Sequence, residues 1–465
     1  MGNHWAVAAY TLAIGNVLSL NHYMPALEVL RDAKTKFEVI GDRLAVAKCM
    51  QIIGDTLRML DRYDEALSNQ EQAKSEFETI GNRQGAAQCR KGIGDTLGML
   101  DRYDDALSSL ERARTEFETI GDRLGAAQCI QGIGDTLREL DRYDDALPNL
   151  EQAKAEFETI GDRLGVAECT RSIGDTLRRL DRYDNALSNL EQAKMEFETM
   201  GDRLGAAQCM KGIGDTLRML HRYEDALSNV EQAKVDFERI GDRLGVADCT
   251  KSIGDTLRML NRYDDALSNL EQAKTEFETI GDPLGAAQCM QCIGETLGML
   301  NRYDDALLNL ERAKAEFETI GGRLSAAQCM QSIGEALRKL YRYDDALSSL
   351  EQAKVRFETI GKWHDAAKCM QRIGKILRRL HRYDAAKPML EQAKAAFEVI
   401  GNRLGTAECG MYLGYLAIAQ GDSDRAEVLL MQSLTMYDSM DMPHRTARCR
   451  TKLAGLRPGQ SASSG

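Results

Sequence analysis

The sequence predicts an all-α fold, an α-solenoid in which pairs of helices follow one another along the chain. A phrase similar to DRYDDALSSL, residues 101–110, returns every forty residues, with its Tyr at positions 63, 103 and onward to 383. Each forty-residue repeat holds two apolar stripes at helical spacing, separated by short segments of turn-forming residues. This internal period takes precedence over the length of 465 residues, which alone would suggest about three globular domains.

The first helix of each repeat is predicted from its apolar spacing and from its start signal. Within residues 81–120, Ala87, Ile93 and Leu97 recur at helical spacing. In eight of ten repeats Asp or Asn stands just before this helix, where its side chain can cap the first turn. Pro283 replaces Arg at about the first helical position of one repeat, where a missing N–H costs little.

A glycine in the middle of the first helix runs against helix propensity. It recurs from Gly15 to Gly414, and each copy costs about 1 kcal/mol relative to Ala. We expect it to let the two helices of a pair cross closely, with a small residue opposite it on the second helix. A further alanine on the second helix should do the same toward the next pair. This structural signature comprises Gly54, Gly94, Gly134, Tyr63, Tyr103, Ala66, Ala106, Ala73 and Ala113.

The turn and the second helix complete the repeat. Asp, Asn, His or Tyr stands between the helices, as at Asp61 and His221, and most of these residues tolerate a tight turn. From Tyr103 the apolar positions again follow helical spacing, and acidic residues fill the other face, so we expect a helix of about 18 residues. A Gly such as Gly121 follows directly, where a left-handed residue ends a helix.

These residues together resemble the signature of the tetratricopeptide repeat (TPR) family. Gly94, Tyr103, Ala106 and Ala113 stand in its order and spacing, and the resemblance covers the chain from about residue 5 to residue 456. The forty-residue form is similar to the repeats of kinesin light chain, of Pins-type adaptors, and of the arrays in NACHT or NB-ARC signalling ATPases. The resemblance implies a right-handed superhelix whose first helices line a concave groove. We expect one array over residues 1–457, with about eleven helical pairs and a terminal helix, then a disordered tail over residues 458–465.

Composition narrows the classes of partner. Formal net charge is −12 and the sequence pI is near 5.2, so the field of the whole chain repels nucleic acid and anionic lipid. No apolar run is long enough to span a bilayer. Eleven of the twelve cysteines recur at forty-residue intervals, too far apart for disulfides in stacked helices, and Cys292 forms only a lone CxxC motif. The sequence therefore predicts a soluble, cytoplasmic protein with free thiols and no nucleic-acid or membrane partner.

The repeat pattern contains no recognisable catalytic motif. The six histidines share no register with one another or with carboxylates, and no glycine-rich phosphate loop follows a strand. Paired acids such as Asp104 and Asp105 open the second helix, where the helix dipole favours negative charge. We predict that the chain is not an enzyme and binds no cofactor or metal.

The exposed side of the first helices is the candidate working surface, because the repeats differ most there. Drift and tuning for a ligand explain this variation equally well. The candidate partner-binding residues are Gln51, Asp55, Lys91, Asp95, Gln131, Asp135, Arg171, Asp175, Lys211, Asp215, Lys251 and Asp255, and near the C-terminal end Lys368, Gln371, Arg372, Lys375, Arg378 and Arg379.

Charge changes sign near that end. The position held by Asp from Asp55 to Asp255 becomes Glu in two repeats and then Lys375. Residues 361–400 carry nine basic and four acidic side chains, whereas residues 241–280 carry five and eight. We expect an acidic groove with a basic end that would attract an acidic or bipolar peptide. A solvated basic helix is the alternative.

Two functions fit the sequence. The first is a non-enzymatic scaffold that binds a peptide or partner protein in the groove. The second is a ligand-sensing array of, or derived from, a NACHT- or NB-ARC-type signalling ATPase.

Overall fold

The computed structural model describes residues 2–19 and 23–456, and all regular elements in these ranges are helices. The predicted all-α class is therefore confirmed. The segment 458–465, expected to be a disordered tail, lies outside the described residues. The chain divides into two compact units, Met1–Gly241 and Asp242–Gly465.

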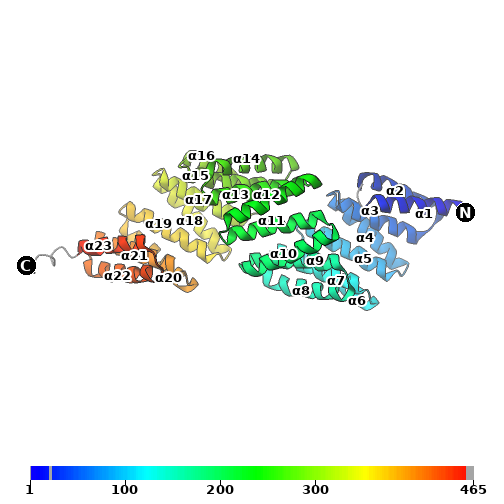
Figure 1. Ribbon diagram of the computed structural model, residues 1–465, viewed down its shortest axis with the longest axis horizontal. Helices are drawn as coiled ribbons and strands as arrows, with labels where there is room; N and C mark the ends of the chain where they lie inside the picture. Colours follow the sequence, from blue (N-terminus) through cyan, green and yellow to red (C-terminus); the bar gives the residue numbers. More distant parts are fainter. Residues whose placement is uncertain (1, 20–22, 457–465) are drawn as a thin grey trace, which may run out of the picture. The chain divides into compact units, whose positions relative to one another are not determined.

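The described residues of the first unit form twelve helices, which alternate between the first and second helix of a pair (Figure 1). They are α1 (Gly2–Leu18), α2 (Tyr23–Ile40), α3 (Arg43–Arg58), α4 (Tyr63–Thr79), α5 (Arg83–Met99), α6 (Tyr103–Ile120), α7 (Arg123–Glu139), α8 (Tyr143–Ile160), α9 (Arg163–Arg179), α10 (Tyr183–Met200), α11 (Arg203–Met219) and α12 (Tyr223–Ile240).

The second unit continues the same alternation with eleven described helices. They are α13 (Arg243–Met259), α14 (Tyr263–Ile280), α15 (Pro283–Met299), α16 (Tyr303–Thr319), α17 (Arg323–Lys339), α18 (Tyr343–Thr359), α19 (Trp363–Arg379), α20 (Tyr383–Ile400), α21 (Arg403–Ala419), α22 (Ser423–Ser439) and α23 (Pro443–Leu456). Odd-numbered helices are first helices, and α23 is a first helix with no described second helix after it.

Local signals place the helix ends where the sequence predicts them. The Asp122 side chain accepts a hydrogen bond from the Gly125 backbone N–H at 2.9 Å and so caps α7. Gly121 ends α6 in the left-handed conformation with φ 78°. The residues between paired helices, from Asp61 to His381, have φ values of 57° to 63°. Pro283 is the first residue of α15.

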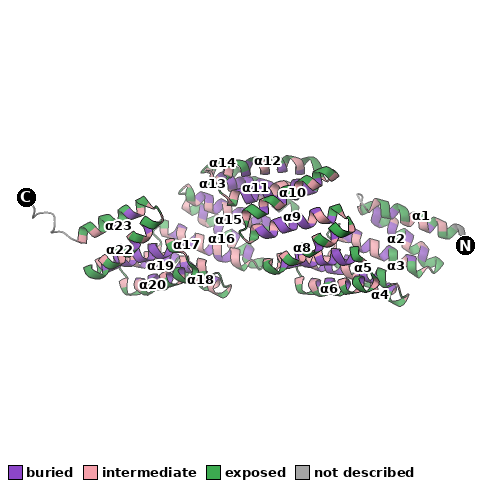
Figure 2. Ribbon diagram, turned by 60° about the horizontal axis from the view of Figure 1, so that its bottom comes forward, coloured by how far each residue is buried: buried purple, intermediate pink, exposed green. Residues whose placement is uncertain are grey.

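Each pair packs on the next within a unit, and the core lies between successive layers (Figure 2). Phe117 and Ala113 of α6 are fully buried and contact Ala126 and Cys129 of α7, one layer further on. Leu110 of α6 likewise joins Ile133 of α7 in a second small cluster. Since each layer buries its apolar side chains against its neighbours, a single pair could not bury them alone.

The glycine in the first helix does permit close approach, although its main neighbour differs from the expected one. A Cβ on Gly94 would lie 2.7 Å from Leu110 Cγ and 3.3 Å from the backbone oxygen of Ala106. Ala106 thus contributes its backbone, and the side chain that fills the space is Leu110. The absent methyl group lets Leu110 lie flat against α5.

The last pair departs from the common core in one buried position. Tyr437 of α22 replaces the Phe of earlier second helices and is 0% exposed. Its hydroxyl has no hydrogen-bond partner among the described residues, and the Arg445 guanidinium lies 5.9 Å from its ring centroid. An unpartnered buried hydroxyl destabilises the fold by about 1–3 kcal/mol.

All twelve cysteines are free, and eleven of them are buried. Burial raises the pKa of the Cys89, Cys129 and Cys209 thiols to about 12. These side chains therefore act as small apolar groups of the core. Across residues 2–19 and 23–456, no cluster of His, Cys, Asp and Glu could hold a metal ion. No helix in those ranges has both the length and the apolar content to cross a lipid bilayer.

Candidate partner-binding site

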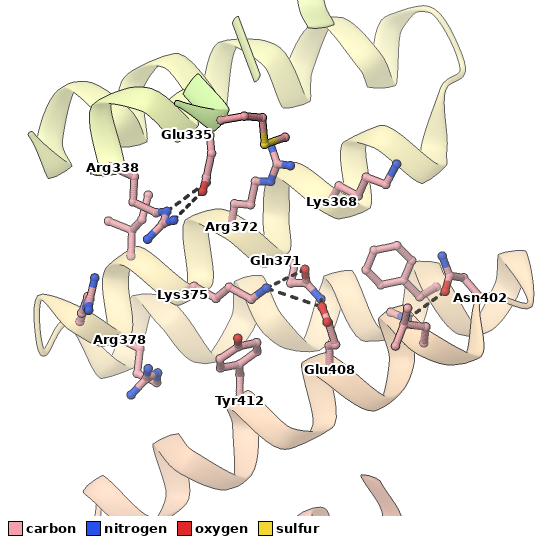
Figure 3. A pocket seen from close by; sticks show the side chains of 16 residues that line it. Glu335, Arg338, Lys368, Gln371, Arg372, Lys375, Arg378, Asn402, Glu408 and Tyr412 are labelled. Atoms are coloured by element: carbon pink, nitrogen blue, oxygen red, sulfur yellow. Dashed lines mark hydrogen bonds and ion pairs between the residues drawn. The ribbon is translucent and has the colours of Figure 1, made fainter. Parts of the chain in front are cut away.

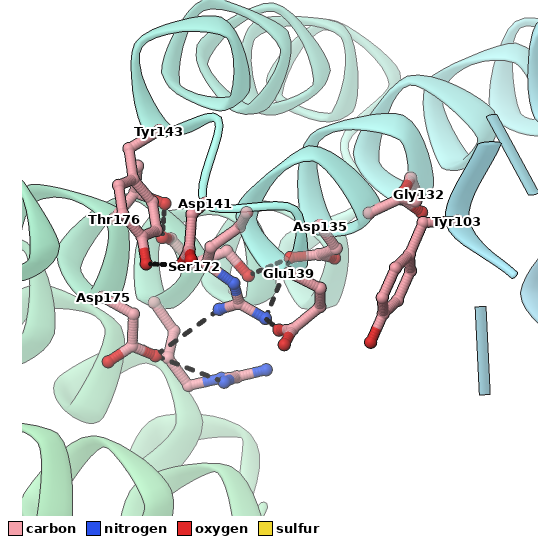
Figure 4. A network of polar contacts seen from close by, with 12 residues as sticks. Tyr103, Gly132, Asp135, Glu139, Asp141, Tyr143, Ser172, Asp175 and Thr176 are labelled. Carbon is pink, nitrogen blue, oxygen red and sulfur yellow. Dashed lines mark hydrogen bonds and ion pairs between the residues drawn. The ribbon is translucent and has the colours of Figure 1, made fainter. Parts of the chain in front are cut away.

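Most of the predicted acidic positions on the first helices are paired with basic side chains. In α7, Arg138 lies 3.7 Å from Asp135, three residues earlier, and 3.9 Å from Asp175 of α9 (Figure 4). Ser172 of α9 also donates a hydrogen bond to Asp135 at 2.9 Å. The carboxylate and guanidinium groups thus form a ladder that ties one first helix to the next.

The same pairing recurs along both units. Asp95 pairs with Lys91 at 2.9 Å, and Asp215 lies 3.3 Å from Lys211. In the second unit, Arg258 lies 3.4 Å from both Asp255 and Glu295. Other candidate residues have the following contacts: Gln51 with Gln88, Asp55 with Gln70, Gln131 with Glu168, Arg171 with Asp175, and Lys251 with Gln288.

Most acids of the expected acidic groove therefore have a basic partner on the same wall. The basic partner is in most cases an Arg three residues after the Asp, which stands at Arg58, Arg138, Arg178, Arg218 and Arg258. A pocket of about 350 Å³ in the first unit does bring together Lys91, Asp95, Gln131 and Asp135. Its wall carries one basic and four acidic side chains, so this pocket keeps a formal negative charge although Asp95 pairs with Lys91.

The ladder is broken at α19. Every Arg of this row from Arg138 to Arg338 has a carboxylate three residues earlier within 4.0 Å. At Arg378 that position is Lys375, and the position one repeat later, where Arg138 finds Asp175, is Tyr415. Arg378 has instead the rings of Tyr412 and Tyr415, each with its centroid 5.8 Å from the guanidinium carbon.

Arg378 is consequently short of acceptors. Its buried Nε has no hydrogen-bond partner among the described residues, which is also true of Arg178, Arg218 and Arg258. Unlike those three, Arg378 forms no ion pair there. Aromatic faces offset part of the cost of burying a guanidinium, but they do not accept its N–H groups in the plane as a carboxylate does. Arg378 therefore lacks the carboxylate partner that the arginines of this row have from Arg138 to Arg338.

The broken ladder lines a pocket of about 750 Å³ formed by α17, α19 and α21 (Figure 3). All six candidate residues predicted near the C-terminal end contribute to its wall. The lining consists of Met299, Glu335, Arg338, Lys368, Gln371, Arg372, Lys375, Ile376, Arg378, Arg379, Phe397, Asn402, Leu404, Gly405, Glu408 and Tyr412. Six of these side chains are basic and two are acidic, so the pocket carries a formal excess of positive charge.

Lys375 stands at the centre of this wall. Its Nζ donates a hydrogen bond to Gln371 Oε1 at 3.0 Å, lies 3.6 Å from Glu408 Oε2, and is 4.6 Å from the centroid of the Tyr412 ring (Figure 3). Burial lowers the pKa of Lys375 to about 8, and the nearby positive charge of Arg372 acts in the same direction. An added anion would reverse this effect by favouring the charged amine.

The two carboxylates of the pocket are already engaged. Glu335 accepts a hydrogen bond from Arg338 Nε at 2.9 Å; although burial acts to raise its pKa, Arg338 outweighs burial and holds that pKa below the ordinary value. Glu408 accepts from Gln371 at 3.1 Å and also pairs with Arg445. Arg372 and Arg379 have no ion pair among the described residues, and the Lys368 amine lies 3.4 Å from Asp365.

Comparison with known proteins decides the family. The family model described as tetratricopeptide repeat matches residues 49–118, 123–194, 203–275 and 360–439, more than half of the chain. The chain belongs to the tetratricopeptide repeat family. A comparison with curated proteins gave no match.

Solved structures similar to this TPR protein share its fold at low sequence identity. A Rap protein complexed with Competence and Sporulation Factor matches with a TM-score of 0.52 and 15% identity, over 72% of this chain and 98% of that one. The apo form of RapI matches with a TM-score of 0.55 and 13% identity, over 77% and 99%. A signal transduction ATPase with numerous domains (STAND) from Pyrococcus horikoshii, which has a tetratricopeptide repeat sensor, matches with a TM-score of 0.59 and 14% identity. That match covers 77% of this chain and 55% of the STAND protein.

Several pocket residues of the TPR protein were not predicted as site residues. Arg338 belongs to the same row as Arg378, and Glu408 to the same row as Gln88, so sequence alignment of the repeats could have found both. Tyr412 of the pocket, and Tyr415 beside it, stand where earlier repeats have no aromatic residue, a departure that the sequence itself shows. Asn402 lines the pocket while capping α21, a role visible in sequence only as a capping signal.

Proposed function

We propose that this TPR protein is a non-enzymatic interaction scaffold that binds an acidic segment of a partner protein in the pocket of α17, α19 and α21. The repeat family supports the scaffold role in general. The pocket supports the acidic character of the segment, because its wall carries six basic and two acidic side chains.

The observation that carries the proposal is the missing carboxylate beside Arg378. Each of its counterparts from Arg138 to Arg338 pairs with an Asp or Glu three residues earlier, whereas Arg378 faces Lys375 at that position. A Glu or Asp side chain, or a terminal carboxylate, of a bound segment would supply the acceptor that the chain itself omits. Arg372 and Arg379 extend the positive wall on the same helix.

The chemistry favours a protein segment over nucleic acid. A chain of net charge −12 repels a polyanion over a long range, whereas a short acidic stretch reaches the local positive field of the pocket. Tyr412 adds aromatic surface that a peptide side chain can contact. The free, buried thiols support a reducing compartment such as the cytoplasm as the place of this binding.

A binding experiment tests the proposal directly. The probe is a fluorescein-labelled peptide of eight residues composed of Glu, Asp and Gly, measured by fluorescence anisotropy against the full chain, with a Lys-containing peptide of equal length as comparison. The pocket variant is Arg372→Glu/Arg379→Glu. The matched control is Arg112→Glu/Arg312→Glu, which changes net charge equally at two exposed residues of α6 and α16.

The pocket variant should weaken binding of the acidic peptide by about tenfold or more, roughly 1.4 kcal/mol, because two charges that face the ligand change sign. The control should stay within about twofold of the wild type, which is the scale of a long-range, screened charge effect. Equal losses in both variants would show that only net charge matters and would reject the pocket.

A sensor role is the second candidate. The similarity to a STAND protein with a tetratricopeptide repeat sensor motivates it. In that case the pocket would recognise a trigger, and an associated ATPase would respond. An ATPase that co-purifies with the chain, and that hydrolyses ATP faster when the acidic peptide is added, would support this role. A partner set without any ATPase would reject it.

A further inference from the structure

The outward face of α1 is apolar and uncovered. Val7, Tyr10, Ile14 and Val17 follow one another at spacings of three and four residues, so they share one side of the helix. Their exposed fractions are 48%, 73%, 55% and 68%, and Ala13 between them is also exposed. No described residue packs over this stripe closely enough to bury it.

The same positions are buried in the interior first helices. When the repeats are aligned on Gly15 and Gly94, the α1 stripe corresponds to residues of α5 that are all buried: Ala86, Cys89, Gly92, Ile93 and Thr96. In α5 this side faces the preceding second helix, α4, and the cluster there includes Ala73 and Phe77 together with Cys89. The exposed stripe of α1 is therefore a stacking face, the side on which each interior layer receives its predecessor.

The last first helix, α23, has a different outer surface. Its exposed residues include Arg448, Arg450 and Lys452, and the helix contains no acidic residue. Arg450 lies 3.4 Å from Asp438 of α22, and the Lys452 amine lies 5.8 Å from the centroid of the Tyr415 ring of α21. By contrast, α1 contains no Asp, Glu, Lys or Arg at all.

We propose that the α1 stripe is an interface between two copies of this chain, with α1 packed against α1 of the second copy about a two-fold axis. The stripe is self-complementary, since two uncharged apolar helices meet without like-charge repulsion or buried charge. Stacking α1 on α23 of another copy would instead place the apolar stripe against a helix with the exposed cations Arg448 and Lys452, which have no ion pair among the described residues. The symmetric contact closes on itself, whereas the α1–α23 contact would continue into open filaments.

One helix face on each side gives a small interface, so the dimer should dissociate reversibly on dilution. Sedimentation equilibrium of the full chain should give a mass near the 51.7 kDa of one chain at low concentration and approach twice that value at about 100 µM. A single-chain mass at every concentration up to that limit overturns the proposal and leaves the stripe to another occupant.

Charge pairs identify the face. In Tyr10→Glu/Ile14→Glu and in Tyr10→Lys/Ile14→Lys, like charges meet across the axis, so each variant alone should remain monomeric. An equimolar mixture should dimerise again, because opposite charges then meet. The control Val399→Glu/Val428→Glu alters two exposed apolar residues of α20 and α22 and should dimerise like the wild type. Dimers of either α1 variant alone, or no recovery on mixing, would place the contact elsewhere and overturn the proposal.

Cross-linking covers the case in which the charged variants do not fold, which circular dichroism would reveal. In Ala13→Cys the added thiol is exposed, whereas the native cysteines near α1, such as Cys49, are buried with a raised pKa. A short bis-maleimide should therefore join two Ala13→Cys chains, and a Val399→Cys chain should stay single. Cross-linking of both variants to the same extent would contradict the α1 contact.

Discussion

The close approach at Gly94 leads to a test in which one substitution has opposite effects at two places of the same helix. Gly94 and Gly98 both lie in α5. A Cβ at Gly94 would stand 2.7 Å from Leu110 Cγ, whereas a Cβ at Gly98 would meet nothing within 4 Å. Replacing either glycine by Ala raises helix propensity, but only Gly94→Ala forces a neighbour to move.

The magnitudes follow from these distances. Gly98→Ala should stabilise α5 by about 0.5–1 kcal/mol, which is the propensity difference. Gly94→Ala should gain the same amount and lose about 1–3 kcal/mol from overpacking against Leu110, for a net loss of about 1 kcal/mol. A loss of this size accelerates amide exchange in the affected layer by a factor of about 5.

Hydrogen–deuterium exchange of peptides from α5 and α6 is the appropriate assay, because stability in a repeat array is local and a whole-chain melt averages over many layers. Gly98→Ala should slow exchange there and Gly94→Ala should accelerate it. Leu110→Ala supplies a further control, since the cavity it leaves can receive the new methyl group and make Gly94→Ala nearly harmless. Slower exchange in Gly94→Ala would refute the close approach as the reason for the glycine.

Three further predictions concern single groups. Peptide binding should weaken about tenfold between about pH 7 and about pH 9, because the pKa of Lys375 is about 8 in the free chain and a bound anion raises it, so the complex needs a proton that the free chain loses. Titration calorimetry should find that the affinity of Lys375→Arg hardly changes with pH. An equal pH dependence in that variant would exclude Lys375 as the titrating group. Tyr437→Phe should raise the free energy of unfolding of the last layer by about 1 kcal/mol, since it removes a buried hydroxyl without a partner. Hydrogen–deuterium exchange in α22 should then become slower, and faster exchange would argue against this. Ellman's reagent should leave nearly all cysteines of the folded chain unreacted and titrate all twelve in denaturant, and rapid reaction of several thiols in the native state would contradict their burial.

Periodic and local features could be predicted from the sequence. The apolar spacing around Phe117, the cap at Asp122 and the left-handed Gly121 each depend on a few consecutive residues, and the structure confirms them. The basic residues around Lys375 could also be located, since a change of charge along one helix is visible when the repeats are aligned.

Features that depend on stacking could not be predicted in this way. Arg138 reaches Asp175 across 37 positions because two first helices lie side by side, and this contact gives a basic partner to an acid of the expected acidic groove. Gln70 shows the same limit. It stands where most repeats have Leu, and its buried amide donates to Asp55 at 3.1 Å and accepts from Thr96 at 3.0 Å. Only the packed layers show that this polar group has partners.

The proposed function requires that a carboxylate of the acidic peptide pairs with Arg378. The affinity of the peptide for Lys375→Asp, measured beside its affinity for Lys375→Met, tests this pairing most directly. Methionine removes one positive charge, and Asp in addition restores to Arg378 the internal carboxylate that Arg178 has in Asp175. We predict that Lys375→Met retains weakened binding and that Lys375→Asp binds at least about tenfold more weakly still, since its own carboxylate takes the place of the peptide's. Equal affinities of the two variants would contradict the account.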